Sequence, residues 1–278
     1  MSAMRYLAPA KLNLFLHVLG RRADGYHDLQ TVFQLVDLCD ELSIEVTDDG
    51  LILRDPLPSD PLLAGLPESA DLSIRAARLL QADSGCRLGA RIHVLKRIPA
   101  GGGLGGGSSD AATVLLALNQ LWQLGFSRER LAGLGLQLGA DVPVFVMGHN
   151  AWAEGRGERL TPVELPPRWF VIVQPPVAVG TAEIFQATEL TRNSPALTMR
   201  AFLAGQGRND CEPVVRGRYP AVAAALDWLA GHAPARLTGT GSCLFAAFDD
   251  EAAAQRVAAQ VPAGCKAFVA QGLARSPA

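Results

Sequence analysis

A glycine-rich stretch in the first half of the chain constrains the fold more than any other feature. From Pro99 to Asp110 the sequence reads PAGGGLGGGSSD, with six glycines in the seven positions 101–107. Glycine has no Cβ atom to block close approach to the backbone, and it tolerates positive φ. A helix that begins after such a loop adds unpaired N–H groups and a dipole that favours an anion. The stretch therefore predicts a phosphate cradle at a helix start, with a nucleotide as its natural ligand.

Other interpretations of this loop fit the sequence less well. The loop matches the G-x-G-x-x-G dinucleotide pattern from Gly101 to Gly106, but the residues about 20 positions later, at 118–122, include no carboxylate to hold a ribose. The P-loop signature needs a lysine directly after its last glycine, and none follows here. A flexible linker would not normally lie between a strand pattern and a strongly periodic helix. The phosphate cradle is the interpretation we favour.

The segments on either side of the loop support the cradle. Residues 91–96 alternate apolar and polar side chains, which predicts a strand, and apolar residues recur at helical spacing over 111–122. Ser108 or Ser109 is a candidate N-cap of this helix, and Asp110 is an acid in its first turn, although both features stabilise any helix. Because a carboxylate beside a triphosphate would be repelled unless a cation lay between them, a nearby Mg²⁺ is a secondary hypothesis.

Composition limits the class of protein. The chain has 278 residues, 49% of them hydrophobic, so we expect two lobes with ample core. A formal net charge of −2 and a pI near 6.2 indicate no excess of positive charge for binding nucleic acid or an anionic membrane. Five scattered cysteines without a C-x-x-C pair suit a reducing cytoplasm.

The apolar N-terminal segment needs a separate check, because it resembles a secretion signal. Lys11, Asn13 and His17 interrupt the apolar run of residues 12–18, which favours a core strand instead. No run in the chain approaches the roughly 18 apolar residues that are needed to cross a bilayer. We therefore expect a cytoplasmic protein.

Periodicity along the chain predicts a mixed α+β protein without a strictly alternating parallel sheet. Three prolines between residues 160 and 167 precede a fresh strand pattern, and they place a lobe boundary that divides the chain into 1–162 and 163–278. We expect strands at about 11–19, 42–46, 51–53, 89–95, 151–154, 169–174, 243–248 and 266–270, and helices at about 72–82, 109–124, 128–138, 221–230 and 251–260.

Two polar side chains on the N-terminal strand are candidates for a site. Alternation along residues 11–18 places Lys11 and Asn13 on one face with Phe15 and His17, and the four aliphatic residues on the other. A lysine beside a buried strand usually only extends its amine to solvent. A role in a site gains weight if a carboxylate lies close to it.

Asp141 is the candidate carboxylate. Gly139 is well placed to end the preceding helix, and an aspartate two residues before Pro143 is common at the N-cap of a following turn, which would be a structural role. In the functional interpretation Asp141 accepts the proton of a hydroxyl that attacks a γ-phosphoryl group. Phosphoryl transfer depends mainly on positioning and charge stabilisation, which a lysine, backbone donors and Mg²⁺ supply.

A second glycine loop lies in the C-terminal half, where residues 237–243 read LTGTGSC before a predicted strand. By itself the pattern indicates an ordinary tight turn. Together with the first loop, it would close the far side of a phosphate site.

Several motifs together resemble a known family. Pro9–Asn13, the first glycine loop and Leu237–Gly241 resemble the three motifs of the GHMP kinase superfamily. Arg22–Thr31 and Gly139–Phe145 narrow the resemblance to the kinases that use ATP to phosphorylate the 2-hydroxyl of a cytidine-diphosphate-linked methylerythritol, in the non-mevalonate route to isoprenoid precursors. The likeness runs from residue 4 to about 270. It implies an N-terminal ribosomal-S5-like lobe and a C-terminal ferredoxin-like lobe, with the active site in the cleft between them.

The resemblance also implies a role for individual residues. Lys11 and Asp141 would be the catalytic pair, and Asn13 would help to position the polyol. Tyr26 and Phe185 would stack on the cytosine, with His27 reading its edge and Thr181 near the same end of the pocket; an aromatic sandwich is a common way to hold one unpaired base. The implied ATP-binding residues are Pro99, Ala100, Gly101, Gly102, Gly103, Leu104, Gly105, Gly106, Gly107, Ser108 and Ser109. ATP and Mg²⁺ are the implied cosubstrate and ion.

One position departs from the family pattern, and two other functions stay open. Relatives carry an asparagine that contacts adenine where this chain has Asp71, and a carboxylate cannot copy the donor of an amide. The alternatives are a homoserine or mevalonate type of GHMP kinase, whose substrates lack a base for Tyr26 to stack on, and a non-catalytic nucleotide-binding sensor. We expect small molecules as partners, without nucleic acid or membrane, and leave a homodimer open.

Overall fold

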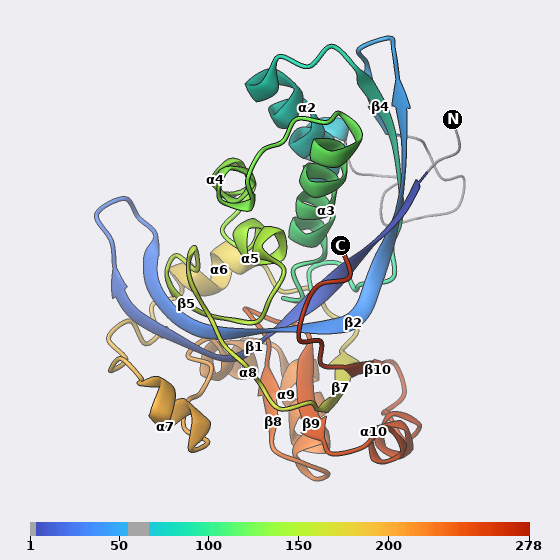
Figure 1. The fold of residues 1–278 in the computed structure, drawn as a ribbon. Helices are drawn as coiled ribbons and strands as arrows, with labels where there is room; N and C mark the ends of the chain where they lie inside the picture. Colours follow the sequence, from blue (N-terminus) through green and yellow to red (C-terminus); the bar gives the residue numbers. More distant parts are fainter. Residues whose placement is uncertain (1–3, 55–66) are drawn as a thin grey trace.

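The computed structural model describes residues 4–54 and 67–278, and these form a mixed α+β fold with two sheets (Figure 1). The strands are β1 (Met4–Arg21), β2 (His27–Thr47), β3 (Ile52–Arg54), β4 (Gly89–Leu95), β5 (Ala151–Gly155), β6 (Arg159–Pro162), β7 (Trp169–Gln174), β8 (Ala235–Leu237), β9 (Leu244–Phe248) and β10 (Lys266–Gln271). The helices are η1 (Glu68–Ala70), α2 (Leu72–Ser84), α3 (Gly106–Leu121), α4 (Arg128–Leu138), α5 (Val142–Met147), α6 (Thr181–Gln186), α7 (Met199–Leu203), α8 (Glu212–Arg218), α9 (Pro220–Ala230) and α10 (Glu251–Ala258). None of the described helices is both long and apolar enough to span a bilayer.

The first sheet is built around the long hairpin of β1 and β2. Its strand order is β3-β4-β2-β5-β6, with β1 paired to β2 along almost the whole length of both strands. Because β2 has 21 residues, one half of it pairs with β4 and the other half with β5. Helices α2 to α5 cover one face of this sheet (Figure 1), and their apolar side chains form the largest core cluster with those of the strands.

The second sheet has the ferredoxin-like arrangement that the family resemblance implies. Its strands are all antiparallel in the order β10-β7-β9-β8, and α10 and the helices between β7 and β8 provide the crossovers. A second core cluster lies between this sheet and its helices. The predicted two-lobe α+β fold is therefore confirmed.

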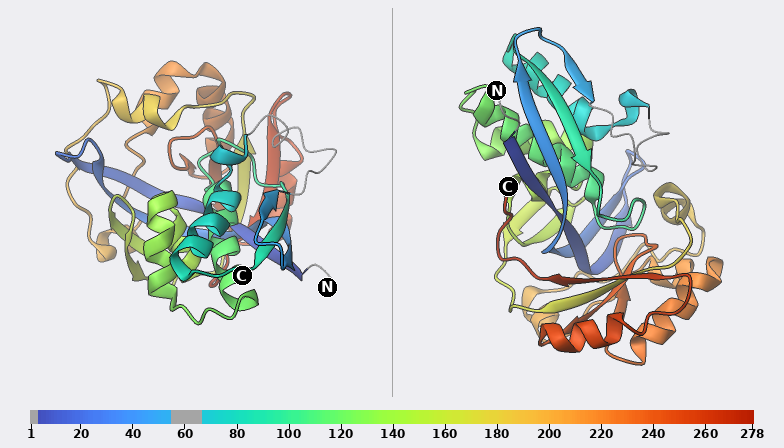
Figure 2. Two further views of the ribbon diagram at one scale, coloured as in Figure 1. Left: turned by 90° about the horizontal axis from the view of Figure 1, so that it is seen from above. Right: turned by 90° about the vertical axis from the view of Figure 1, so that its right-hand side faces the viewer.

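A third apolar cluster joins the two sheets. Leu12 of β1 and Leu104 of the glycine loop pack there with Phe170 and Phe245 of the second sheet. The chain after β10 returns to the first sheet (Figure 2). There the N–H of Leu273 donates to the carbonyl of Leu35 at 2.8 Å. Because these contacts cross between the lobes, the glycine loop is held against both of them. The division into 1–162 and 163–278 stays a prediction, and its first part includes residues 1–3 and 55–66, which lie outside the described part.

The structure corrects the sequence analysis at two points that shape the site. Gly105, with φ of 74°, takes the N-cap position of α3, so the predicted caps Ser108 and Ser109 lie inside the first helical turn. In β1, a register shift between Asn13 and Leu16 inserts an extra residue opposite β2. The bulge exchanges the two faces, so Leu16 lines the same cavity as Asn13 and not the face of Leu12.

Candidate active site

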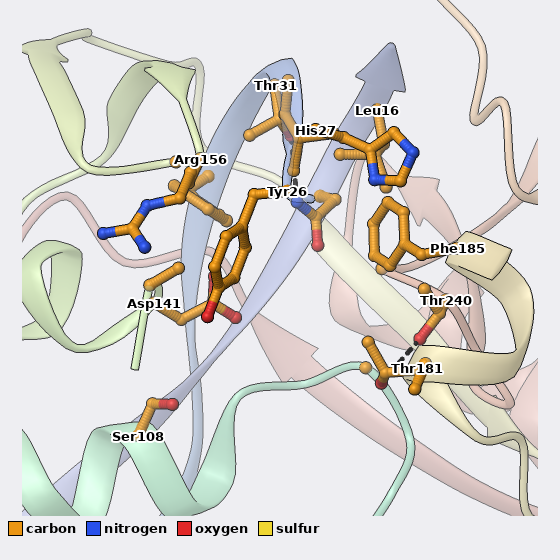
Figure 3. Close-up of a pocket in the computed structure, with 18 of the residues that line it drawn as sticks. Leu16, Tyr26, His27, Thr31, Ser108, Asp141, Arg156, Thr181, Phe185 and Thr240 are labelled. Atoms are coloured by element: carbon orange, nitrogen blue, oxygen red, sulfur yellow. Dashed lines mark hydrogen bonds between the residues drawn. The ribbon is translucent and has the colours of Figure 1, made fainter. Parts of the chain in front are cut away.

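A cavity of about 730 Å³ lies between the β1–β2 hairpin, the glycine loop and α6 (Figure 3). Residues from both lobes line it, which agrees with a site in the cleft between them. The residues singled out from the sequence that line this cavity are Lys11, Asn13, Tyr26, His27, Gly103, Ser108, Asp141, Thr181 and Phe185. The fold therefore brings the implied catalytic and substrate-binding residues together, although they come from segments up to 174 positions apart.

Lys11 lines this cavity and is almost fully buried, with 3% of its surface exposed. Its ammonium group donates to the side-chain oxygen of Asn13 at 2.6 Å and to the carbonyl of Gly103 at 2.9 Å. It also lies 3.4 Å from a carboxylate oxygen of Asp141. Three oxygen atoms thus fix the position of the charge, so Lys11 does not extend its amine to bulk solvent.

The backbone geometry of Asp141 leaves its carboxylate available for chemistry. Asp141 precedes α5, but its side chain makes no capping hydrogen bond to the helix, so the structural alternative does not hold. The side chain is about one-third exposed and faces Lys11. A carboxylate that is partly exposed and held beside a lysine is placed to accept a proton from a bound hydroxyl.

A second cavity, of about 460 Å³, follows the glycine loop. Its lining includes every residue from Pro99 to Ser108. Ser109 is fully buried and does not line it. The two cavities share Gly103, Ser108, Asp141 and Thr181, so Asp141 lies where they meet.

The second glycine loop packs directly on the first. The N–H of Cys243 donates to the carbonyl of Gly102 at 3.2 Å, and the hydroxyl of Thr238 accepts from the backbone N–H of Asn13 at 3.0 Å. Gly239 and Thr240 line the larger cavity, and Thr240 shares a hydrogen bond with Thr181 at 3.1 Å (Figure 3). The loop therefore packs on the first loop and closes one side of the larger cavity, whereas the sequence analysis expected it at the phosphate site.

We predict that Gly103→Ala is more damaging than Gly101→Ala. Both glycines have positive φ, so either alanine costs about 1–2 kcal/mol of backbone strain. A Cβ atom at Gly101 faces open space, whereas one at Gly103 overlaps the carbonyl of Thr238 and forces the two loops apart. Urea unfolding and the KM for ATP measure the difference. Equal losses in the two variants would show that contact between the loops is unimportant.

Aromatic side chains gather at one end of the larger cavity. The Tyr26 side chain, 56% exposed, lies on one side, and Phe185 lies on the other with His27 stacked on it at 5.3 Å between ring centroids (Figure 3). Burial lowers the pKa of His27, and the positive charges of Arg192 and Arg21 add to this effect. His27 is therefore held in its neutral form at neutral pH.

Three arginines of this cavity escaped the sequence analysis. Arg21, Arg156 and Arg192 line it, and the guanidinium of Arg156 lies 4.8 Å from the centroid of the Tyr26 ring. Arg21 ends β1, whereas the other two lie between regular elements. No periodicity marks such positions, so the sequence pattern carried no signal for these three arginines.

A buried charge cluster supports the start of α3. Lys96 donates to Asp110 at 2.6 Å and also to Asp40, whose other oxygen accepts from the N–H of Ile98 at 2.8 Å. Lys96 and Asp110 line the glycine-loop cavity. The ammonium of Lys96 thus places a positive charge beside Asp110, and the Mg²⁺ that the sequence analysis expected there stays a prediction. Lys96 lies at the end of a predicted strand, shortly before the glycine loop, so its place near the site could have been predicted from the sequence.

Asp71 has a structural role in addition to its place in the lining of the same cavity. One carboxylate oxygen caps α2 by accepting the N–H of Ser73 at 2.9 Å, and the other lies 3.5 Å from the guanidinium of Arg54. Both oxygens therefore have partners within the protein.

Comparison with known proteins agrees with this geometry. Residues 71–149 match the family model for the GHMP kinases N terminal domain, and residues 187–267 match the one for the GHMP kinases C terminal domain. A relative from Alkalilimnicola ehrlichii, named 4-diphosphocytidyl-2-C-methyl-D-erythritol kinase, is 59% identical over 97% of this chain and 91% of its own length. The chain belongs to the GHMP kinase family, among the 4-diphosphocytidyl-2-C-methyl-D-erythritol kinases. As a GHMP kinase it is an ATP-dependent small-molecule kinase.

Solved structures of GHMP kinases share the fold. A crystal structure of 4-(cytidine 5'-diphospho)-2C-methyl-D-erythritol kinase is 35% identical and superposes with a TM-score of 0.81 over 97% of this chain and all of that one. The Methanococcus jannaschii mevalonate kinase has a TM-score of 0.71 over 98% of this chain and 99% of its own, but only 16% identity, so it shows a shared fold alone.

Proposed function

We propose that this GHMP kinase transfers the γ-phosphoryl group of ATP to the 2-hydroxyl of 4-diphosphocytidyl-2-C-methyl-D-erythritol, a step in non-mevalonate isoprenoid precursor synthesis, with Lys11 and Asp141 as the catalytic pair. The observation that carries the assignment of roles is the position of this pair. Asp141 lies where the glycine-loop cavity meets the aromatic cavity, and Lys11 is 3.4 Å from it. Each substrate then has a cavity of its own, and the reacting atoms meet at the junction.

In this mechanism the hydroxyl oxygen attacks the γ-phosphorus while the bond to the β–γ bridging oxygen breaks. Asp141 accepts the hydroxyl proton, and ADP leaves with the bridging oxygen. The ammonium of Lys11, fixed by Asn13 and Gly103, stabilises the charge that develops on the transferred group. Backbone N–H groups of the loop before α3 hold the other phosphate oxygens.

The carboxylates in the glycine-loop cavity suit a magnesium ion that binds with the nucleotide. Such an ion takes one or two protein carboxylates and completes its shell with phosphate oxygens and water. Asp141 and Asp110 both line this cavity, and one oxygen of Asp110 has no hydrogen-bond partner among the described residues. When bound, Mg²⁺ neutralises charge on the phosphate oxygens.

The aromatic end of the larger cavity supports a base-bearing substrate. The proposal places the cytosine between Tyr26 and Phe185, with His27 at its edge and Thr181 nearby. Homoserine and mevalonate have no ring to fill this space. The proposal also places the kinase in the cytoplasm, with ATP and the cytidine-linked polyol as its small-molecule partners, and leaves a homodimer open.

The test is ADP release from purified protein with a panel of alcohols: the cytidine-linked methylerythritol, homoserine and mevalonate. We expect turnover with the first alone, and inhibition by cytidine nucleotides. Turnover with mevalonate or homoserine and no cytidine binding would favour the other type of GHMP kinase. No turnover with any alcohol, together with tight nucleotide binding, would favour a sensor.

A further inference from the structure

We propose that Arg192 is a positioning residue for base recognition: it holds His27 in the tautomer that carries its proton on Nδ1, and it fixes Phe185 against the same ring. This inference deepens the proposed function and depends on it for the identity of the ligand. Arg192 lies in the segment after α6 and lines the aromatic end of the larger cavity.

The contact with His27 determines which ring nitrogen is protonated. The Nε of Arg192 lies 3.1 Å from Nε2 of His27. A guanidinium group can only donate, so Nε2 must accept with its lone pair. A neutral imidazole that accepts at Nε2 carries its proton on Nδ1. Arg192 therefore leaves His27 with one donor for a ligand.

The remaining donors of Arg192 hold the end of α6. Its Nη2 donates to the carbonyls of Phe185 at 2.8 Å and Ala187 at 2.6 Å, and Nη1 donates to the carbonyl of Leu190 at 3.2 Å. Carbonyls at a helix C-terminus have no partner within the helix, so the guanidinium group supplies the missing donors. One side chain thus couples the start of β2 in the first lobe to the base-stacking helix of the second.

The charges around His27 favour its neutral form, which is also the form that the contact with Arg192 requires. Arg192 approaches from the segment after α6, and Arg21 approaches from the end of β1; both positive charges lower the pKa of His27, after the larger effect of burial. The ring stacked on His27 is that of Phe185, which carries no charge. The ring therefore stays neutral, and the tautomer set by Arg192 persists near neutral pH.

This tautomer has a consequence for the choice of base. Cytosine presents acceptors at O2 and N3, whereas uracil carries a hydrogen on N3. Where the Nδ1 donor faces N3 of the base, it matches the acceptor of cytosine and opposes the N3–H of uracil. Sites that discriminate by a fixed hydrogen bond reject the mismatched analogue strongly, because a polar group is left unpaired. We infer that Arg192 contributes to the selection of cytosine through His27.

The first test needs no substrate. In the full-length protein labelled with ¹⁵N-histidine, the chemical shifts of the two ring nitrogens report the tautomer and the pKa, and the spectrum of His27→Gln assigns the signal. In the wild type we expect His27 to be protonated on Nδ1 and unprotonated on Nε2. In Arg192→Met the tautomers should redistribute and the pKa of His27 should rise toward about 6.5. Protonated Nε2 in the wild type, or an unchanged signal in Arg192→Met, would overturn the inference.

Arg156→Met is the matched control. It removes another arginine of the same cavity, which contacts Tyr26 and is not bonded to His27, so it should not change the His27 tautomer. Arg192→Lys keeps the positive charge but loses the forked set of N–H donors of the guanidinium group. It provides a folded variant if Arg192→Met unfolds. We expect an intermediate tautomer population in this variant. The wild-type population in Arg192→Lys would show that charge alone is sufficient.

The second test uses cytidine 5'-diphosphate and uridine 5'-diphosphate as probes in calorimetry. The wild type should prefer the cytidine form, and Arg192→Met should narrow the preference by about tenfold, the equivalent of one lost hydrogen bond. In turnover assays the KM for the cytidine-linked substrate should rise, with kcat and the KM for ATP little changed. If neither probe binds to the wild type, the proposed function fails and the tautomer result stands. If cytidine is preferred equally by the wild type and Arg192→Met, the proposed function stands and the role of Arg192 fails.

Discussion

Asp141→Asn is expected to lower kcat by about 10²- to 10⁴-fold, the usual contribution of a positioned general base. An amide has nearly the shape of the carboxylate, but it cannot accept the proton of the attacking hydroxyl. Asp141 makes no capping bond to α5, so the substitution should leave the fold intact. The KM for ATP should change only modestly, because backbone N–H groups of the glycine loop also bind the phosphates. A coupled ADP-release assay at saturating substrate measures kcat.

The control is Asp227→Asn, which removes a carboxylate from an exposed ion pair with Arg216. Surface pairs of this kind contribute little to stability, and this one lies outside both cavities. Its kcat should equal that of the wild type. Near-normal turnover in Asp141→Asn would rule out Asp141 as the base, whatever the position of its side chain.

Lys96→Met is expected to lower the free energy of unfolding by about 3–5 kcal/mol, the cost of breaking a buried ion pair by removal of one partner. The change leaves Asp40 and Asp110 side by side in the interior, and both are at least 95% buried. Asp40 also holds the backbone N–H of Ile98 at the start of the glycine loop, so repulsion there should loosen the loop. Urea unfolding at pH 7.5 measures the loss.

Arg130→Met is the matched control, because it removes the cation of an exposed pair with Asp83. It should cost less than about 1 kcal/mol. A loss of the same small size in Lys96→Met would mean that the buried cluster is not electrostatically coupled.

The same cluster predicts a pH dependence. Burial raises the pKa of Asp110 to about 7, and the charge of Asp40 adds to the rise while Lys96 opposes it. The folded chain therefore retains a proton that the unfolded chain releases near its ordinary pKa of 3.8. The contribution of Asp110 to stability should fall as the pH rises from about 4 to 7. Asp110→Asn has no titrating group at this position, so its free energy of unfolding should vary less with pH across this window. Parallel plots of unfolding free energy against pH for the variant and the wild type would contradict a raised pKa of Asp110.

The local sequence pattern was sufficient to predict an element where its own residues carry an uninterrupted periodicity. The strands β4 and β7 and the helix α4 have the predicted bounds, because alternation or an amphipathic stripe fills each of them without interruption. The glycine loop was equally clear, since only a close approach or a turn requires so many residues without a side chain. Its contact with the second glycine loop was also expected from the sequence.

Other features depend on contacts that no local pattern records. The helices α5 to α8 have five to seven residues each, too short for a periodic signal, and the sequence analysis missed them, as it did η1, β6 and β8. The bulge after Asn13 reverses the strand faces and is visible only in the pairing with β2. Lys11 and Asp141 are 130 positions apart, so their meeting was implied by family resemblance and not by spacing. The Arg192 contacts depend on both lobes, which puts them beyond sequence analysis.

A crystal structure of the complex with the cytidine-linked methylerythritol and a non-hydrolysable ATP analogue tests the central claim most directly. The distance to measure is that between the 2-hydroxyl oxygen and the nearer carboxylate oxygen of Asp141. The account predicts hydrogen-bond reach, about 2.6–3.2 Å, with the γ-phosphate on the glycine-loop side of the hydroxyl. A hydroxyl out of reach of Asp141, or a γ-phosphate outside the glycine loop, would contradict it.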